Sequence, residues 1–197
     1  MRQVNAALRR IPEWWLWLAG ALPLALLIHD AFGGLLGVDP VREIEHRLGR
    51  TGFYFLIATL AVTPLRRRVG LNLIHLRRAL GLLSFSYVLL HLLAWAVFDM
   101  GLLWRQMLGD VARRPYLLFG MSAFAILLIL AMTSNRFSIR RLGRWWSRLH
   151  RLVYIAAVLA SLHWIWALKL LPGWVIFCLG LMGLTLLSRF LPTRRTP

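Results

Sequence analysis

The chain has 197 residues, of which 59% are hydrophobic and 16% are charged. Soluble domains are about 45–50% apolar and about 25% charged, so this composition excludes an ordinary soluble protein and a disordered one. The formal net charge is +17, but the basic residues lie between apolar runs. That distribution indicates membrane topology rather than nucleic-acid binding. The single cysteine, Cys178, excludes a disulfide framework and a cysteine-rich metal site.

Six apolar runs predict an all-α membrane protein with six transmembrane helices, because only helices or closed barrels satisfy the backbone in lipid and these runs do not alternate as barrel strands do. The runs are residues 14–29, 52–65 (beginning near Leu48), 79–98, 116–133, 152–171 and 173–191. Spans and short connections use up the length. Residues 1–197 are therefore predicted to form one transmembrane domain.

Basic residues concentrate in alternate connections between these runs. Residues 1–13, 66–78, 134–151 and the tail from Ser188 hold 17 of the 24 Lys and Arg residues. The remaining connections hold seven basic residues and six of the seven acids. The positive-inside rule then predicts that both termini are cytoplasmic. The third and fifth helices would run parallel, from the inside to the outside.

Histidine is the candidate for chemistry inside the spans, where Asp and Glu occur only at the edges. His91 lies 13 residues after Arg78, and His163 lies 12 residues after Arg151. At a rise of 1.5 Å per residue, both are roughly 18–20 Å from the cytoplasmic edge. Two imidazoles at one level on parallel helices are the axial ligand set of a bis-histidine haem. We therefore expect a haem between the third and fifth helices.

Small residues near these histidines, such as Ala156 and Ala160, leave room for a macrocycle, although they also suit close helix packing. His150 is harder to interpret, because the residues at matching depth on the third helix are Arg77 and Arg78. A second haem at His150 stays open. Arg77 lies nearly on the face of His91 and is a candidate partner for an acidic cofactor group, or simply a cytoplasmic anchor. His46 and His75 are expected to be solvated loop residues.

Several motifs together resemble the MsrQ (YedZ) family of ferric-reductase-like transmembrane proteins. The resemblance covers nearly the whole chain and includes His91 and His163. The motifs are TPLRRR at 63–68, NLIHLRRALGL at 72–82, RPYLLFG at 114–120, TSN at 133–135 and RLGRWWSRLHRLVY at 141–154.

The resemblance implies a haem-binding subunit in the bacterial inner membrane. Such a subunit takes electrons from the quinone pool or a cytosolic flavin reductase and passes them to a periplasmic molybdenum-containing methionine sulfoxide reductase, MsrP, for repair of oxidised proteins. It implies haem b and FMN as cofactors, and the family's functional histidines map onto His91, His150 and His163. No residues for FMN are assigned. The chain would transfer electrons without substrate chemistry of its own. Membrane lipid is a further expected partner, and nucleic acid is not.

Two other functions stay open at this stage. One is a small-solute or metal transporter with the histidines as transient ligands, which the lack of carboxylates in the spans and of an obvious internal repeat disfavours. The other is a membrane anchor or assembly factor with structural histidines.

Overall fold

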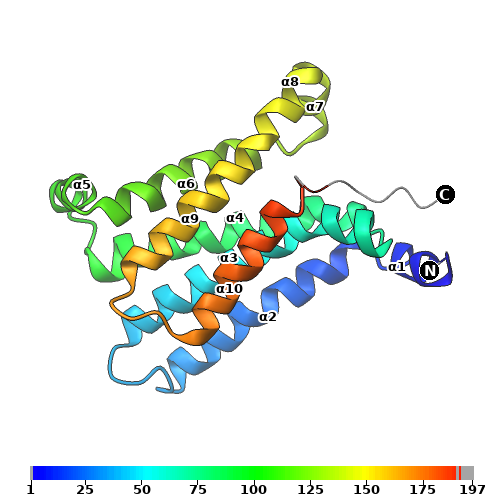
Figure 1. Ribbon diagram of the computed structural model, residues 1–197. Coiled ribbons are helices and arrows are strands. Elements are labelled where there is room, and N and C mark those ends of the chain that lie inside the picture. Colours follow the sequence, from blue (N-terminus) through cyan, green and yellow to red (C-terminus); the bar gives the residue numbers. More distant parts are fainter. Residues whose placement is uncertain (1, 190, 192–197) are drawn as a thin grey trace.

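The computed structural model describes residues 2–189 and 191, and over these residues its regular structure is entirely helical (Figure 1). The long apolar helices are α2 (Glu13–Phe32), α3 (Pro40–Pro64), α4 (Arg77–Ala94), α6 (Pro115–Met132), α9 (Val153–Ala167) and α10 (Gly173–Leu187). Shorter helices are α1 (Arg2–Arg9), α5 (Trp104–Arg113), α7 (Arg136–Leu142) and α8 (Arg144–Leu149). Single turns of π or 3₁₀ helix join them: Leu65–Val69, Ile74–Leu76, Trp95–Asp99 and His150–Leu152.

Five helical segments among the described residues are long and apolar enough to cross a membrane. They are Glu13–Phe32, Pro40–Val69, Ile74–Asp99, Pro115–Met132 and Arg144–Ala167. The sixth predicted span corresponds to α10, which is apolar but has only 15 residues. At 1.5 Å per residue it is about 22 Å long, shorter than the roughly 30 Å hydrocarbon core. A sixth crossing therefore stays a prediction.

The second span begins earlier than its predicted start near Leu48. The side chain of Asp39 caps α3 by accepting a hydrogen bond from the backbone N–H of Arg42 at 3.1 Å, and Pro40 occupies the first turn. Both features favour a helix start. Consequently the charged stretch 42–50, expected as a loop up to about residue 47, is helical and presents its side chains at fixed angles.

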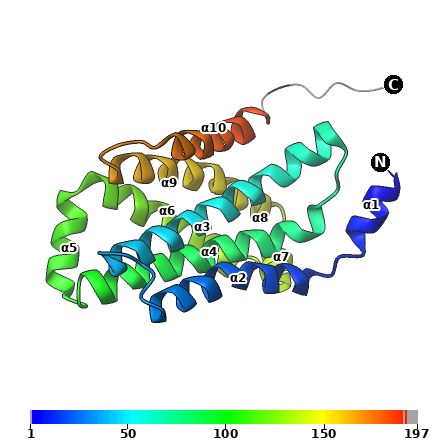
Figure 2. The same cartoon turned by 90° about the horizontal axis from the view of Figure 1, so that it is seen from below.

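Two antiparallel helix pairs form the centre of the molecule. Helix α3 packs along α4, and α6 packs along α9. Helix α2 covers α3 and α4, while α10 packs against α3 and α9 (Figures 1 and 2). The main core lies between the pairs, where Leu60, Ala156 and Ala157 are fully buried. His91 on α4 and His163 on α9 each lie on one helix of a packed pair.

The connections separate into two ends of the bundle. Helices α1, α7 and α8 lie at one end, with the turns between α3 and α4 (Figures 1 and 2). Helix α5 lies at the other end, with the α2–α3 and α9–α10 connections. The first end carries the arginine-rich stretches 66–78 and 134–151, and the second carries six of the seven acids. The alternation of charge along the chain thus makes one end of the bundle rich in arginine and places most acidic residues at the other end.

Helices α3 and α4 approach most closely at Gly52. The Ser84 hydroxyl, which is fully buried, donates to the carbonyl of Gly52 at 2.8 Å. A Cβ at position 52 would lie 2.9 Å from Cγ2 of Val88 and 3.3 Å from its backbone nitrogen. Small residues at such contacts let helix backbones pack closely in a membrane.

Replacing Gly52 by alanine should destabilise the protein. The two helices would have to separate, at a cost of about 1–3 kcal/mol typical of overpacking. We expect a lower midpoint of thermal unfolding in detergent. Gly81→Ala is the matched control, because the nearest atom to its new Cβ is Cγ2 of Thr59 at an ordinary 3.6 Å. That control should leave the midpoint unchanged or raise it, since alanine favours helix over glycine. Equal losses in both variants would contradict the close contact at Gly52.

A histidine pair in a shared cavity

His91 and His163 face one cavity from different helix pairs. His91 lies on α4 and His163 on α9, and their ring centroids are 6.2 Å apart with an angle of 70° between the ring planes. Because a metal–imidazole nitrogen bond is about 2.0 Å long, two rings bonded to one metal ion from opposite sides have centres about 6 Å apart. The spacing is therefore that of two ligands on one metal ion.

The hydrogen bonds of both rings define which nitrogen is free. Nδ1 of His91 is 2.9 Å from the carbonyl oxygen of Glu45 on α3, and Nδ1 of His163 is 2.8 Å from that of Tyr116 on α6. A carbonyl oxygen only accepts, so each Nδ1 carries the proton and donates. In the neutral ring Nε2 then has the free lone pair. Histidines that bind metals are commonly oriented by a bond of this kind.

A glycine lies one helical turn beyond each of these carbonyls. A Cβ at Gly49 would lie 3.3 Å from Nδ1 of His91, and a Cβ at Gly120 would lie 2.7 Å from Nδ1 of His163. The absence of a side chain therefore lets each ring reach the backbone of the neighbouring helix. The carbonyl, glycine and histidine of the second pair follow those of the first by 71, 71 and 72 residues. The histidine arrangement is thus built twice.

Apolar side chains line most of the cavity, whose volume is about 180 Å³. Val88 from α4, Trp95 from the π-helical turn after α4, and Ala160 and Ala167 from α9 contribute to the wall. Ser84 and Tyr87, also on α4, contact α3 and α2 instead, and the Tyr87 hydroxyl donates to the Gly20 carbonyl of α2 at 2.6 Å.

Three further ionisable side chains line this cavity, all from the first half of α3: Glu45, His46 and Arg50. The expectation that His46 is a solvated loop residue is therefore wrong, since it is half-buried on a helix at the cavity. The Asp39–Pro40 start signal could have revealed this. His75 also differs from expectation, because its Nε2 is buried and has no hydrogen-bond partner among the described residues.

His150 lies at a second cavity of about 490 Å³ toward the arginine-rich end. Its ring stacks on Trp146 with centroids 4.0 Å apart, and its Nε2 is 3.1 Å from the Thr133 hydroxyl. Arg77, Arg78 and Arg151 also line this cavity, with no carboxylate among its described lining residues. Arg77 does not line the His91–His163 cavity, so its position links it to His150 instead.

The two cavities are neighbours. Leu56 of α3 and Leu127 of α6 line both of them. No group of three or more His, Cys, Asp or Glu side chains arranged to hold a metal ion occurs among the described residues. What the described residues of this cavity offer is a pair of imidazoles. It suits a metal whose remaining ligands come from a cofactor, as in haem.

Comparison with known proteins decides the family. Residues 48–161 match the model of the ferric reductase like transmembrane component. Proteins of Brucella ovis, Brucella canis and Brucella suis, each named protein-methionine-sulfoxide reductase heme-binding subunit MsrQ, are 42% identical over 93% of this chain and 86% of their own length. The chain belongs to the MsrQ family. Its apolar helices and its ferric-reductase-like domain make it a multi-pass membrane protein. No solved structure matches it.

Proposed function

We propose that this chain is a membrane electron-transfer subunit that holds a haem b between His91 and His163 and delivers electrons to a methionine sulfoxide reductase. The two oriented imidazoles, 6.2 Å apart in one apolar cavity, carry this proposal. Relatives that match most of the chain are named heme-binding subunits of such a reductase, and the matched domain is named for ferric reductases.

The residues fit a haem by the chemistry of the donor set. Each ring has its Nδ1–H bonded to a backbone carbonyl, which leaves Nε2 for iron. Gly49 and Gly120 allow that orientation, and the apolar wall suits a porphyrin face. When bound, haem supplies one-electron chemistry between its ferric and ferrous states. The protein orients both ligands and excludes water, and no other residue has to react.

The orientation follows from charge. The positive-inside rule places the arginine-rich end, with helices α1, α7 and α8, in the cytoplasm of a bacterial inner membrane. Both termini are then cytoplasmic if α10 is the sixth crossing. The His91–His163 cavity would lie toward the periplasm, because the residues of α3 that line it belong to the acidic end. This position suits electron delivery to a periplasmic MsrP-type molybdenum enzyme.

The second cavity is the candidate for electron entry. His150 with Arg77, Arg78 and Arg151 forms a cationic pocket that favours an anionic cofactor, either a second haem or FMN. Leu56 and Leu127, which line both cavities, would then lie next to both cofactors. A quinone or a cytosolic flavin reductase would supply electrons from this side.

The transporter and the anchor or assembly factor remain the rival functions, and an absorption spectrum separates them from the proposed one. A reduced-minus-oxidised spectrum of the detergent-solubilised protein should have sharp haem b bands. A colourless protein, purified after expression with adequate haem supply, would contradict electron transfer through haem.

The histidines should separate by role. His91→Ala or His163→Ala removes one of two axial bonds, so we expect most haem at this site to be lost, measured as haem per protein. His150 lies 13 residues from His163, about 20 Å along ideal helix, and cannot ligate the same haem. His150→Ala should leave that haem bound and chemically reducible but slow its reduction by a cytosolic-side donor. Full haem content in both His91→Ala and His163→Ala would overturn the ligand assignment.

The glycines should show a graded effect. Gly120→Ala places a Cβ 2.7 Å from Nδ1 of His163 and should displace the ring, with strong loss of haem. Gly49→Ala, at 3.3 Å from the His91 ring, should cause a smaller loss. Gly183→Ala is the control, because nothing lies within 4 Å of its new Cβ. Haem per folded protein is the measurement, and a loss in Gly183→Ala equal to that in Gly120→Ala would refute the steric account.

Labelling tests the orientation. In a Cys178→Ser background, Arg141→Cys should resist a membrane-impermeant maleimide in intact spheroplasts and react after lysis. Arg105→Cys, at the opposite end, should react in both. Both side chains are exposed. The reverse pattern would place the arginine-rich end outside.

A further inference from the structure

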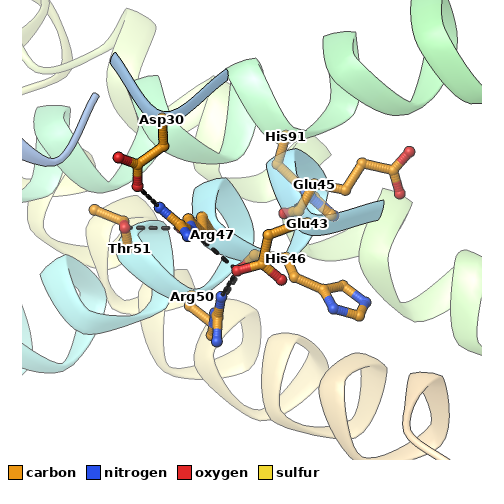
Figure 3. Close-up of polar contacts among 8 residues, drawn as sticks. All are labelled: Asp30, Glu43, Glu45, His46, Arg47, Arg50, Thr51 and His91. Atoms are coloured by element: carbon orange, nitrogen blue, oxygen red, sulfur yellow. Dashed lines mark hydrogen bonds and ion pairs between the residues drawn. The ribbon is translucent and has the colours of Figure 1, made fainter. Parts of the chain in front are cut away.

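We propose that Arg50 and His46 form a carboxylate-binding subsite in the His91–His163 cavity, which holds the acidic side chains of the haem. The inference rests on the proposed haem function and assigns two residues that the axial ligands do not include. It concerns the polar end of the cavity, drawn in Figure 3.

The location follows from where the cavity is polar. Haem has an apolar macrocycle with two carboxylates on one edge, and a buried carboxylate is costly unless it is paired. Apart from the two ligands, Glu45, His46 and Arg50 are the ionisable side chains among the described residues of the wall. Of these, only His46 and Arg50 can donate a hydrogen bond to a carboxylate when Glu45 is ionised. The acidic edge should therefore face the first half of α3.

Arg50 is held in place but keeps donors free. Its Nε donates to the carbonyl of His46 at 3.1 Å, and its Nη2 donates to Glu43 at 2.9 Å. The guanidinium lies over the ring of Trp174, 5.5 Å from its centroid. Its Nη1 has no hydrogen-bond partner among the described residues. Since a guanidinium has five N–H donors, Arg50 keeps donors for a carboxylate beside these two bonds.

His46 lies one helical turn before Arg50 and thus on the same face of α3. Its ring is half-buried and makes no hydrogen bond with the described residues. Glu45 is about 100° away around the helix. Figure 3 shows its carboxylate turned away from the Arg50 guanidinium. His46 and Arg50 both line the cavity.

Arg47 provides a matched comparison. It belongs to the same ion network, because it binds Asp30 and donates to Glu43 at 2.8 Å, but it does not line the cavity (Figure 3). Charge removal at Arg47 therefore disturbs the network without touching the cavity wall.

The test is a redox titration of the haem absorption, with the rate of haem transfer to excess apomyoglobin as a second readout. Ferric haem is one charge more positive than ferrous haem, so a cation beside it favours reduction. Arg50→Gln should shift the midpoint potential of the haem to a more negative value. It should also speed haem transfer by about tenfold or more, which is the effect expected from losing one charge-assisted hydrogen bond. Arg47→Gln should leave both close to wild type.

Equal shifts in the two variants, or no change in Arg50→Gln, would overturn the subsite. If Arg50→Gln does not fold, His46→Leu is the second variant, because it keeps the ion network intact. It should still speed haem transfer, and an unchanged transfer rate in this variant would overturn the subsite. These failures are distinct from failure of the proposed function, in which the wild-type protein binds no haem at this site.

Discussion

The histidine site depends on two hydrogen bonds between an imidazole and the backbone of a neighbouring helix. Each bond requires the ring to lie against a helical turn, and each turn has a glycine, where a Cβ would collide with the His163 ring at Gly120 and crowd the His91 ring at Gly49. The bond fixes the tautomer, because a carbonyl cannot donate. Packing of α3 on α4 and of α6 on α9 thus positions both rings, since a shift of either pair would move the Nε2 atom that the proposed haem requires.

The same construction occurs twice, about 72 residues apart, and the two copies meet at the cavity. Leu56 and Leu127, also 71 residues apart, occupy equivalent places between the two cavities. The copies differ at the arginine-rich end, where the equivalent of His150 in the first half is Arg78. The first cavity therefore has a histidine from each half, whereas the second combines histidine with arginine. That asymmetry favours different cofactor chemistry in the two places.

The number of residues from the last charge before each helix to its histidine was enough to predict that His91 and His163 meet. On parallel helices, residues at equal distances from the same end lie at the same depth in the membrane. The span of α6 was predicted within a residue at either end. The start of α3 was missed because residues 42–50 are dense in charge, and there hydropathy outweighed the Asp39–Pro40 cap. That error also hid His46 and Arg50 from the predicted site.

Other features had no signal that spacing alone could reveal. The partners of both Nδ1 atoms are backbone carbonyls, which any residue supplies, and only Gly49 and Gly120 hint at the contact. The internal repeat was not obvious in the sequence, because it preserves the spacing of a few residues of the site and not the sequence between them. Arg77 was placed nearly on the face of His91 by helical angle, and the structure places it at the second cavity. One face of a helix about 20 Å long passes both cavities. The angle of a residue around the helix axis therefore does not show which cavity it lines unless its position along the axis is also known.

Electron paramagnetic resonance of the oxidised protein tests the central claim most directly, because the signal depends on the axial ligands. Two imidazoles on one ferric iron give a low-spin signal. In a His150→Ala protein, which isolates the His91–His163 site, we expect this low-spin signal alone. A high-spin ferric signal from that protein would show that only one histidine binds the iron, and would contradict the account.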